Sequence, residues 1–425
     1  MHVLYYMDLF VDLNKNIEER SFVAKCDLNA DFLGRYSKNE KDLKVSYVAL
    51  ESIIKKINND KTFSSNNVNL ISIPDAEVKG ILSLYNTSVE MIVSGTASHE
   101  VLQHISDYLS RKLKGIVPEL VVYWEYCSDI LFSLYPNATF LEGSHTGFWR
   151  LEQNSDILFN VTTKNEVYKD VFYDAVNNMT LTADDKSELY KLKKTFKDSV
   201  LFQTQINREY LDPQNKFKHL VFYAGNFPSL RFKKYSGYAT NAAFLQHLLD
   251  ILPDDCGIVY SKHSFDAARE DHFINNNPRI IDLAAISAVD ADASLRVLPY
   301  VDAIINVYSN IFMPAMLVGT PVFSYGTSPN AKFALANVSD LPCWLNANKQ
   351  VSQNYLDLAE KLLKYVVTHK VNTRFLRNAR NSFLYLKKIS ENIKNNKGYI
   401  NYLPEMGTIR GYTARFTQAI LTKNP

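Results

Sequence analysis

The stretch Tyr238–Asp266, YATNAAFLQHLLDILPDDCGIVYSKHSFD, contains a helix pattern followed directly by a strand pattern. Apolar residues recur three or four positions apart between Phe244 and Leu249, which predicts an amphipathic helix over Asn241–Ile251. Thr240 or Asn241 is a suitable N-cap for this helix. A Pro-Asp pair ends the helix, and the apolar run Gly257–Tyr260 predicts a buried strand. A helix that leads into a buried strand is typical of an α/β fold.

Short apolar runs alternate with longer amphipathic stretches along the whole chain, which favours parallel sheets with crossover helices. In the first half, the predicted strands are Val45–Leu50, Val68–Ile73, Val89–Val93, Val117–Tyr123, Ala138–Leu141 and Ile157–Asn160. In the second half, they are Val200–Thr204, His219–Tyr223, Gly257–Tyr260, Arg279–Leu283, Ala303–Asn306 and Pro321–Tyr325. Helical patterns between them include Glu51–Asn58, Ser98–Leu113, Asp184–Lys197 and Tyr355–Val367.

Two successive α/β halves of about 200 residues predict two Rossmann-like domains. We expect an N-terminal Rossmann-like domain over residues 1–198 and a C-terminal Rossmann-like domain over residues 199–395. Residues 396–425 are expected to form a tail that crosses back to the N-terminal domain. Ligands of such sheets bind at the carboxyl ends of the strands, so the expected active site is the cleft between the domains.

The composition excludes several classes of protein. The chain has 425 residues, of which 46% are hydrophobic and 22% charged, and its net charge of +2 lacks the basic bias expected of a nucleic-acid-binding protein. The cysteines Cys26, Cys127, Cys256 and Cys343 form no CxxC pair, which argues against a zinc site and favours reduced thiols in the cytoplasm. The N-terminus lacks a signal-peptide pattern, and no apolar run is long enough to span a membrane.

Polar residues follow the predicted strands of the second half. Lys262 and His263 come directly after Gly257–Tyr260, where two donors would suit a phosphate. Ser309 and Asn310 follow Ala303–Asn306 and precede a helix pattern, which is a suitable place for an anion. The alternative interpretation is a solvated loop with ordinary polar residues.

The order of these elements resembles the Kdo transferases that use CMP-Kdo to build bacterial capsule and lipopolysaccharide. The resemblance covers about a hundred residues of the second half. The residues that carry it are Thr240-Asn241, Pro253-Asp254, Ile258-Val259-Tyr260, Lys262-His263, Leu298–Asp302, Ser309, Ala315–Gly319 with Pro321-Val322, and Tyr325-Gly326. The resemblance implies an α/β fold of the GT-B type, with two Rossmann-like domains facing a central cleft, and a CMP-linked acidic sugar as donor.

By this resemblance Lys262 and His263 bind the nucleotide phosphate together with Ser309 and Asn310. The expected nucleotide-sugar site is completed by Asn226, Thr240 and Tyr325. In the family the histidine is usually followed by proline, whereas Ser264 stands there in this chain.

The first half offers a related passage. Glu142-Gly143 follows a predicted strand and resembles the acidic residue and glycine of the family, with Arg150 as the basic residue of the acceptor side. A carboxylate in such a turn can act as a general acid or base, so Glu142 is the first catalytic candidate and His145 the second. The alternative for Glu142 is a loop carboxylate that caps a turn or pairs with Arg150.

One departure from the family concerns the nucleophile. The retaining family carries a carboxylate after the first strand of the second domain, but no Asp or Glu lies between Gly225 and Phe232. Three explanations remain. In the first, the equivalent strand is VLFQTQINREYLD, which offers Glu209 or Asp212. In the second, the enzyme is an inverting one and uses Glu142 as its base. In the third, the chain has lost the activity. The second explanation is preferred. Inverting sialyltransferases of the GT-B type have a similar set of motifs, so both Kdo and sialic-type sugars stay open as the donor.

The sequence therefore predicts a metal-independent glycosyltransferase without a cofactor, whose substrates are a CMP-linked acidic sugar and a surface-polysaccharide or other glycan acceptor. Asp290-Ala-Asp292 is interpreted as a helix cap and not as a metal site. The alternatives are a GT-B transferase with a UDP, GDP or CDP donor, a glycan-binding relative without activity, and a sugar-nucleotide epimerase. We expect a cytoplasmic protein without a nucleic-acid partner, with peripheral association at the inner face of the membrane as a further expectation.

Overall fold

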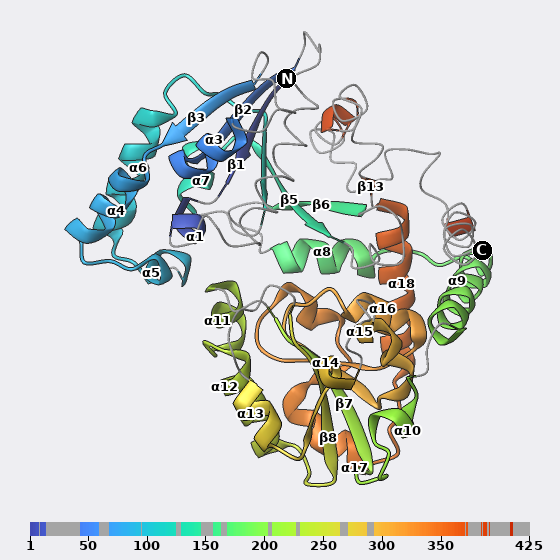
Figure 1. The fold of residues 1–425 in the computed structure, drawn as a ribbon. Coiled ribbons are helices and arrows are strands. Elements are labelled where there is room, and N and C mark those ends of the chain that lie inside the picture. The colour runs from blue at the N-terminus through green and yellow to red at the C-terminus, as the bar shows by residue number, and fades with distance from the viewer. Residues whose placement is uncertain are drawn as a thin grey trace. The chain divides into compact units, whose positions relative to one another are not determined.

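The computed structural model divides into two compact units (Figure 1). The structure describes residues 1–7, 9–13, 43–58, 68–94, 96–124, 129–145, 156–162, 168–202, 206–226, 230–263, 271–286, 293–369, 371–372, 384, 386–388, 391 and 409–410. The first unit comprises Met1–Ser144, Ile157–Val171 and Lys370–Leu403, and the second comprises His145–Asp156, Phe172–His369 and Pro404–Pro425. Residues 172–198, which were expected in the N-terminal domain, group here with the second unit.

The first unit contains a seven-stranded sheet in the order β13-β6-β5-β4-β1-β2-β3. Its strands are β1 (His2–Tyr6), β2 (Lys44–Leu50), β3 (Val68–Ile73), β4 (Leu120–Trp124), β5 (Thr139–His145), β6 (Asp156–Thr162) and β13 (Val371–Asn372). The pairs β1–β2, β2–β3, β1–β4 and β4–β5 are parallel. The described helices are α1 (Leu9–Leu13), α3 (Glu51–Asn58), α4 (Asp75–Leu84), α5 (Val89–Ser94), α6 (His99–Lys112), α7 (Asp129–Leu134) and α8 (Tyr168–Asn177), which runs across the division.

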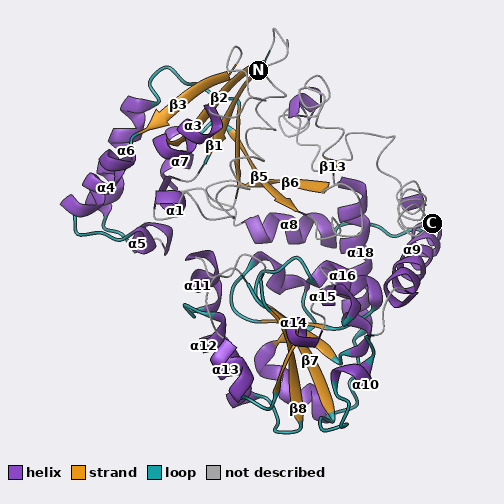
Figure 2. Cartoon of the chain, in the orientation of Figure 1, coloured by secondary structure: helices purple, strands orange, loops and turns teal. Residues whose placement is uncertain are grey.

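The second unit contains a six-stranded sheet in the order β12-β11-β10-β7-β8-β9, with every described pair parallel. The strands are β7 (His219–Ala224), β8 (Cys256–Ser261), β9 (Ile280–Asp282), β10 (Ala303–Asn306), β11 (Val322–Ser324) and β12 (Ala336–Asn337). The helices are α9 (Ala183–Phe202), α10 (Arg208–Leu211), α11 (Leu230–Ser236), α12 (Asn241–Ile251), α13 (Asp271–Asn276), α14 (Leu283–Ile286), α15 (Ala293–Arg296), α16 (Phe312–Val318), α17 (Leu341–Asn346) and α18 (Gln353–His369). Figure 2 shows these helices around the strands.

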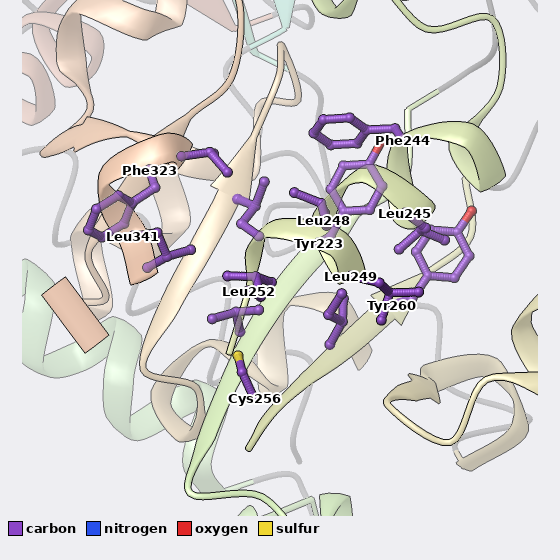
Figure 3. Packing of buried hydrophobic residues seen from close by; sticks show 14 of the residues in the cluster. Tyr223, Phe244, Leu245, Leu248, Leu249, Leu252, Cys256, Tyr260, Phe323 and Leu341 are labelled. Carbon is purple, nitrogen blue, oxygen red and sulfur yellow. The ribbon is translucent and has the colours of Figure 1, made fainter. Parts of the chain in front are cut away.

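Helices cover both faces of the second sheet. On one face Tyr223, Tyr260 and Phe323 are buried with the apolar side of α12 and with Leu341 of α17 (Figure 3). On the other face the Tyr355 hydroxyl of α18 accepts a hydrogen bond from the Val322 N–H of β11 at 3.1 Å, and α16 packs beside β10 and β11. Strands buried on both faces explain why the sequence shows continuous apolar runs here.

The α/β class and the two Rossmann-like units are confirmed, and most predicted elements are present with shifts of a few residues at their ends. Two predicted strands are wrong. Val89–Val93 lies in α5, and Val200–Thr204 overlaps the end of α9. Strand β1 was not predicted, although it lies between β4 and β2 in the first sheet. Among the described residues no helix is long and apolar enough to cross a membrane.

Candidate functional site

The order of the second sheet determines where a ligand would bind in this unit. From β7 the chain adds β8 and then β9 on one side. It then returns to the other side of β7, where it adds β10, β11 and β12 in turn. Open parallel sheets bind ligands outside the carboxyl ends of the strands at such a switch point. The candidate site of the second unit is therefore the edge where β7 and β10 end.

Six of the seven predicted nucleotide-sugar residues lie at this edge, because each of them follows the carboxyl end of a strand. Asn226 follows β7, Lys262 and His263 follow β8, Ser309 and Asn310 follow β10, and Tyr325 follows β11. Because all these strands are parallel, their carboxyl ends share one edge. The seventh residue, Thr240, reaches the same edge at the start of α12, because Asn241 bonds the turn after β7.

The turn after β7 is held by a buried amide network. The Asn241 Oδ1 accepts hydrogen bonds from the Tyr223 hydroxyl at 2.7 Å and from the Asn226 N–H at 3.0 Å, while its Nδ2 donates to the Asn226 carbonyl at 2.8 Å. Gly225 is required because a Cβ there would lie 2.9 Å from the Tyr260 ring. Asn226 itself is 2% exposed, and its Nδ2 donates to the Tyr223 hydroxyl at 3.3 Å. In this geometry Asn226 positions the turn, so the structure favours a supporting role over ligand contact.

Thr240 also has a local structural role. Its hydroxyl accepts a hydrogen bond from the Ala243 N–H at 3.1 Å and caps α12, as the sequence predicted. Thr240 is exposed at the start of α12.

Tyr325 belongs to an aromatic cluster beside the edge. Its ring packs against Phe244 at 4.9 Å, His247 at 5.2 Å and Tyr238 at 6.0 Å between ring centroids. Burial, followed by a hydrogen bond with Tyr325, raises the pKa of Tyr238 to about 12, so the Tyr238 phenol stays neutral at physiological pH.

Ser309 and the two strand ends beside it provide polar groups. The Ser309 hydroxyl accepts a hydrogen bond from the Ile311 N–H at 3.4 Å, which orders the turn before α16. Behind this turn, Asn306 and Ser324 are register partners at the ends of β10 and β11, so their side chains share one face of the sheet. Both are buried, and neither side chain has a hydrogen-bond partner among the described residues. Sequence analysis missed them, although a polar residue at the end of an otherwise apolar strand is the signal that could have found them.

Lys262 and His263 add two basic residues to this edge. Both are half-buried directly after β8, where partial burial strengthens the attraction between a cation and an anion. The residues that follow, including Ser264, lie outside the described part of the chain.

Glu209 and Asp212 are not brought to this edge. Glu209 is exposed on α10, next to Arg208, whose guanidinium donates to the Lys218 carbonyl at 2.9 Å. Lys218 precedes β7, so α10 lies at the amino end of the sheet. Asp212 is buried and accepts the Lys216 and Phe217 N–H groups at 2.9 and 2.8 Å. The alternative in which this passage is the equivalent strand is wrong, because its residues 200–202 belong to α9 and its residues 208–211 form α10.

The catalytic candidates of the first unit are only partly described. Glu142 and His145 lie in β5, and Glu142 is the register partner of Tyr123 near the end of β4. Their side chains and the whole of Arg150 lie outside the described residues, so their roles remain predictions. Within the described part of the chain, no group of His, Cys, Asp or Glu side chains could hold a metal ion.

No family model and no curated protein matches this chain. Solved structures with a similar fold include two of KpsC from Thermosulfurimonas dismutans. The β-Kdo 2,7 transferase is 14% identical, covers 74% of this chain and 97% of its own, and has a TM-score of 0.39. The β-Kdo 2,4 transferase is 11% identical, covers 67% and 96%, and has a TM-score of 0.38. The calicheamicin glycosyltransferase CalG4 is 9% identical, covers 91% and 98%, and has a TM-score of 0.34. At these identities and TM-scores the likeness carries no information about donor or acceptor.

Proposed function

We propose that this chain is a GT-B glycosyltransferase that moves an acidic sugar of the Kdo or sialic type from a CMP donor to a glycan acceptor. The observation that carries the proposal is the placement of Lys262, His263 and Ser309 at the switch-point edge of a Rossmann-like sheet. These are the residues on which the sequence resembles the CMP-Kdo-dependent transferases. Their common edge supports a role for them in one site.

The proposed reaction replaces one bond at the anomeric carbon with another. The bond between this carbon and the phosphate oxygen of CMP breaks, and the acceptor hydroxyl oxygen forms the new bond. The leaving phosphate gains negative charge, which Lys262 and His263 stabilise in place of a metal. Groups positioned toward developing charge typically contribute factors of about 100 to 1,000 in turnover.

The acceptor hydroxyl must lose its proton during this step. We propose Glu142 as the general base, with His145 as the second candidate. Glu209 is not proposed for this role, because it lies on α10 at the amino end of the second sheet. Without a carboxylate between Gly225 and Phe232, the proposal is a direct, inverting displacement.

The experiment is a thermal-stability comparison with CMP, CDP, UMP, UDP and GDP, made on the wild type and on two matched variants. Lys262→Ala removes a cation from the carboxyl edge, and Lys218→Ala removes an exposed lysine from the amino edge of the same sheet. At a nucleotide concentration of about 100 times Kd, binding adds roughly 2.7 kcal/mol to the free energy of unfolding. We expect CMP to stabilise the wild type and Lys218→Ala but not Lys262→Ala.

The same panel distinguishes the alternatives. Stabilisation by UDP or GDP alone would overturn the CMP donor and leave a transferase or epimerase with another nucleotide. Stabilisation by CMP that survives unchanged in both Lys262→Ala and His263→Ala would overturn the phosphate assignment. A glycan-binding relative without activity is recognised if CMP binds but the labelled CMP-sugar is neither transferred nor hydrolysed.

A further inference from the structure

Helix α9 has one side that packs against the second unit and one side that faces solvent. Leu189, Leu192 and Phe196 are buried on the inner side. Two ion pairs beside this inner side connect α9 to α18. Lys193 pairs with Glu360 at 2.8 Å, and Asp185 pairs with Lys364 at 2.6 Å. These contacts of α9 are thus directed inward.

Three lysines on the outer side of α9 have no such partner. Lys186, Lys194 and Lys197 are exposed, and their side chains form no ion pair or hydrogen bond within the described part of the chain. Tyr190 stands between them and is 69% exposed. We call these four residues the lysine–tyrosine stripe.

The helical repeat aligns the stripe. Its residues are spaced by four, four and three positions, so they fall within one sector of about 80° on the helix surface. From Lys186 to Lys197 the stripe is about 16 Å long. The acidic residues of α9 lie outside this sector: Asp185 and Glu188 are paired with lysines, Asp184 lies near Arg410, and Asp198 is exposed at the border of the sector.

The composition of the stripe indicates its partner. Three unpaired cations in a row complement a surface of fixed negative charge, while the chain as a whole carries only +2. Long lysine side chains reach the phosphates of a lipid surface, and a tyrosine ring is favoured at the level of the headgroups. A convex helix side provides no groove for a single polymer strand, whereas it can lie on a flat surface.

We propose that the lysine–tyrosine stripe of α9 docks the protein on an anionic phospholipid surface. A lysine close to such a surface typically increases binding about fivefold, so three lysines together contribute about a hundredfold. The interaction is electrostatic and therefore weakens as the salt concentration rises. The inference does not depend on the proposed enzymatic function.

The experiment is sedimentation of the full chain with vesicles of phosphatidylcholine mixed with phosphatidylglycerol, compared with vesicles of phosphatidylcholine alone. The stripe variant carries Lys186→Gln, Lys194→Gln and Lys197→Gln, since glutamine keeps a similar helix propensity. The matched control carries Lys79→Gln, Lys114→Gln and Lys218→Gln, three exposed lysines elsewhere that lower the net charge equally.

We expect the wild type to bind only the anionic vesicles. The stripe variant should bind them about a hundredfold more weakly, while the control variant keeps the wild-type affinity. Tyr190→Ser should weaken binding without changing its dependence on salt. Absence of vesicle binding by the wild type, or equal losses in the two triple variants, would overturn the proposal. Binding to soluble polyphosphate without vesicle binding would overturn the lipid assignment in favour of a soluble polyanion.

Discussion

Replacing Asn241 with alanine tests whether the amide network fixes the turn after β7. Asn241 is fully buried, and the replacement removes the acceptor of the Tyr223 hydroxyl and both backbone partners of Asn226. A buried polar group left without a partner costs about 1–3 kcal/mol. With three such groups, and with some relief by water entering the space, we expect a loss of about 3–5 kcal/mol.

The assay is hydrogen exchange read by mass spectrometry on peptides from β7 and α12. A loss of about 3 kcal/mol lowers the protection of amides that exchange by cooperative opening by more than a hundredfold. The control is Gln246→Ala, an exposed amide on the same helix, which should change stability by less than about 0.5 kcal/mol. A loss below about 1 kcal/mol for Asn241→Ala would refute the reasoning, because the network would then not hold the turn.

Three further predictions concern the second unit. Gly326→Ala should lower the thermal midpoint strongly, because Gly326 has a φ of +81° and a Cβ there would overlap the Tyr235 carbonyl oxygen; an unchanged midpoint would contradict this. Burial lowers the pKa of His219, so the folded state favours the neutral imidazole, and this stabilisation is lost as the pH falls below about 6.5. The free energy of urea unfolding should therefore differ less between about pH 7 and about pH 5 in His219→Leu than in the wild type. Burial raises the pKa of Cys256 to about 12, so iodoacetamide should modify the exposed Cys343 in the native protein and reach Cys256 only after unfolding.

The periodicity of the sequence was enough for most strands and helices of the second unit. Gly257–Tyr260 and Ala303–Asn306 are continuous apolar runs, which a strand covered on both faces requires. The capped helix Asn241–Ile251 was predicted with its observed ends, because Thr240 and the Pro-Asp pair mark them locally. Signals that lie within a few residues of an element are thus readable from the sequence.

The two wrong strands show where periodicity fails. Val89–Val93 was too short to separate a strand from a helix. Among its described side chains Val89 and Ile92 are buried, a spacing of three that suits α5. The apolar residues Val200–Phe202 continue α9 instead of starting a strand. A short apolar run fixes burial but not conformation, so these errors come from local ambiguity.

The common edge of the candidate residues was predictable, whereas the contacts of single residues were not. Strand ends gave Lys262, His263 and Ser309 correctly as residues of one edge, because the edge follows from parallel order. The role of Asn226 depends on Asn241, which is distant along the chain and approaches only when α12 packs on the sheet. Likewise, the position of Glu209 depends on the contact of Arg208 with the residues before β7, which no local pattern reveals.

The contacts around Asp302 explain why the amino edge of the second sheet is unsuited to catalysis. Asp302 lies directly before β10, and its carboxylate accepts hydrogen bonds from the Lys349 Nζ at 2.7 Å and the Leu220 N–H at 2.9 Å. Burial alone would raise the pKa of Asp302, but these two bonds hold it below the usual value, so the carboxylate stays charged and engaged. An acid held in this way anchors β7 to β10 and has little capacity to exchange protons with a substrate. The same strand ends at Asn306, three residues before Ser309, so the ion pairs of Asp302 and the candidate site lie at opposite ends of β10.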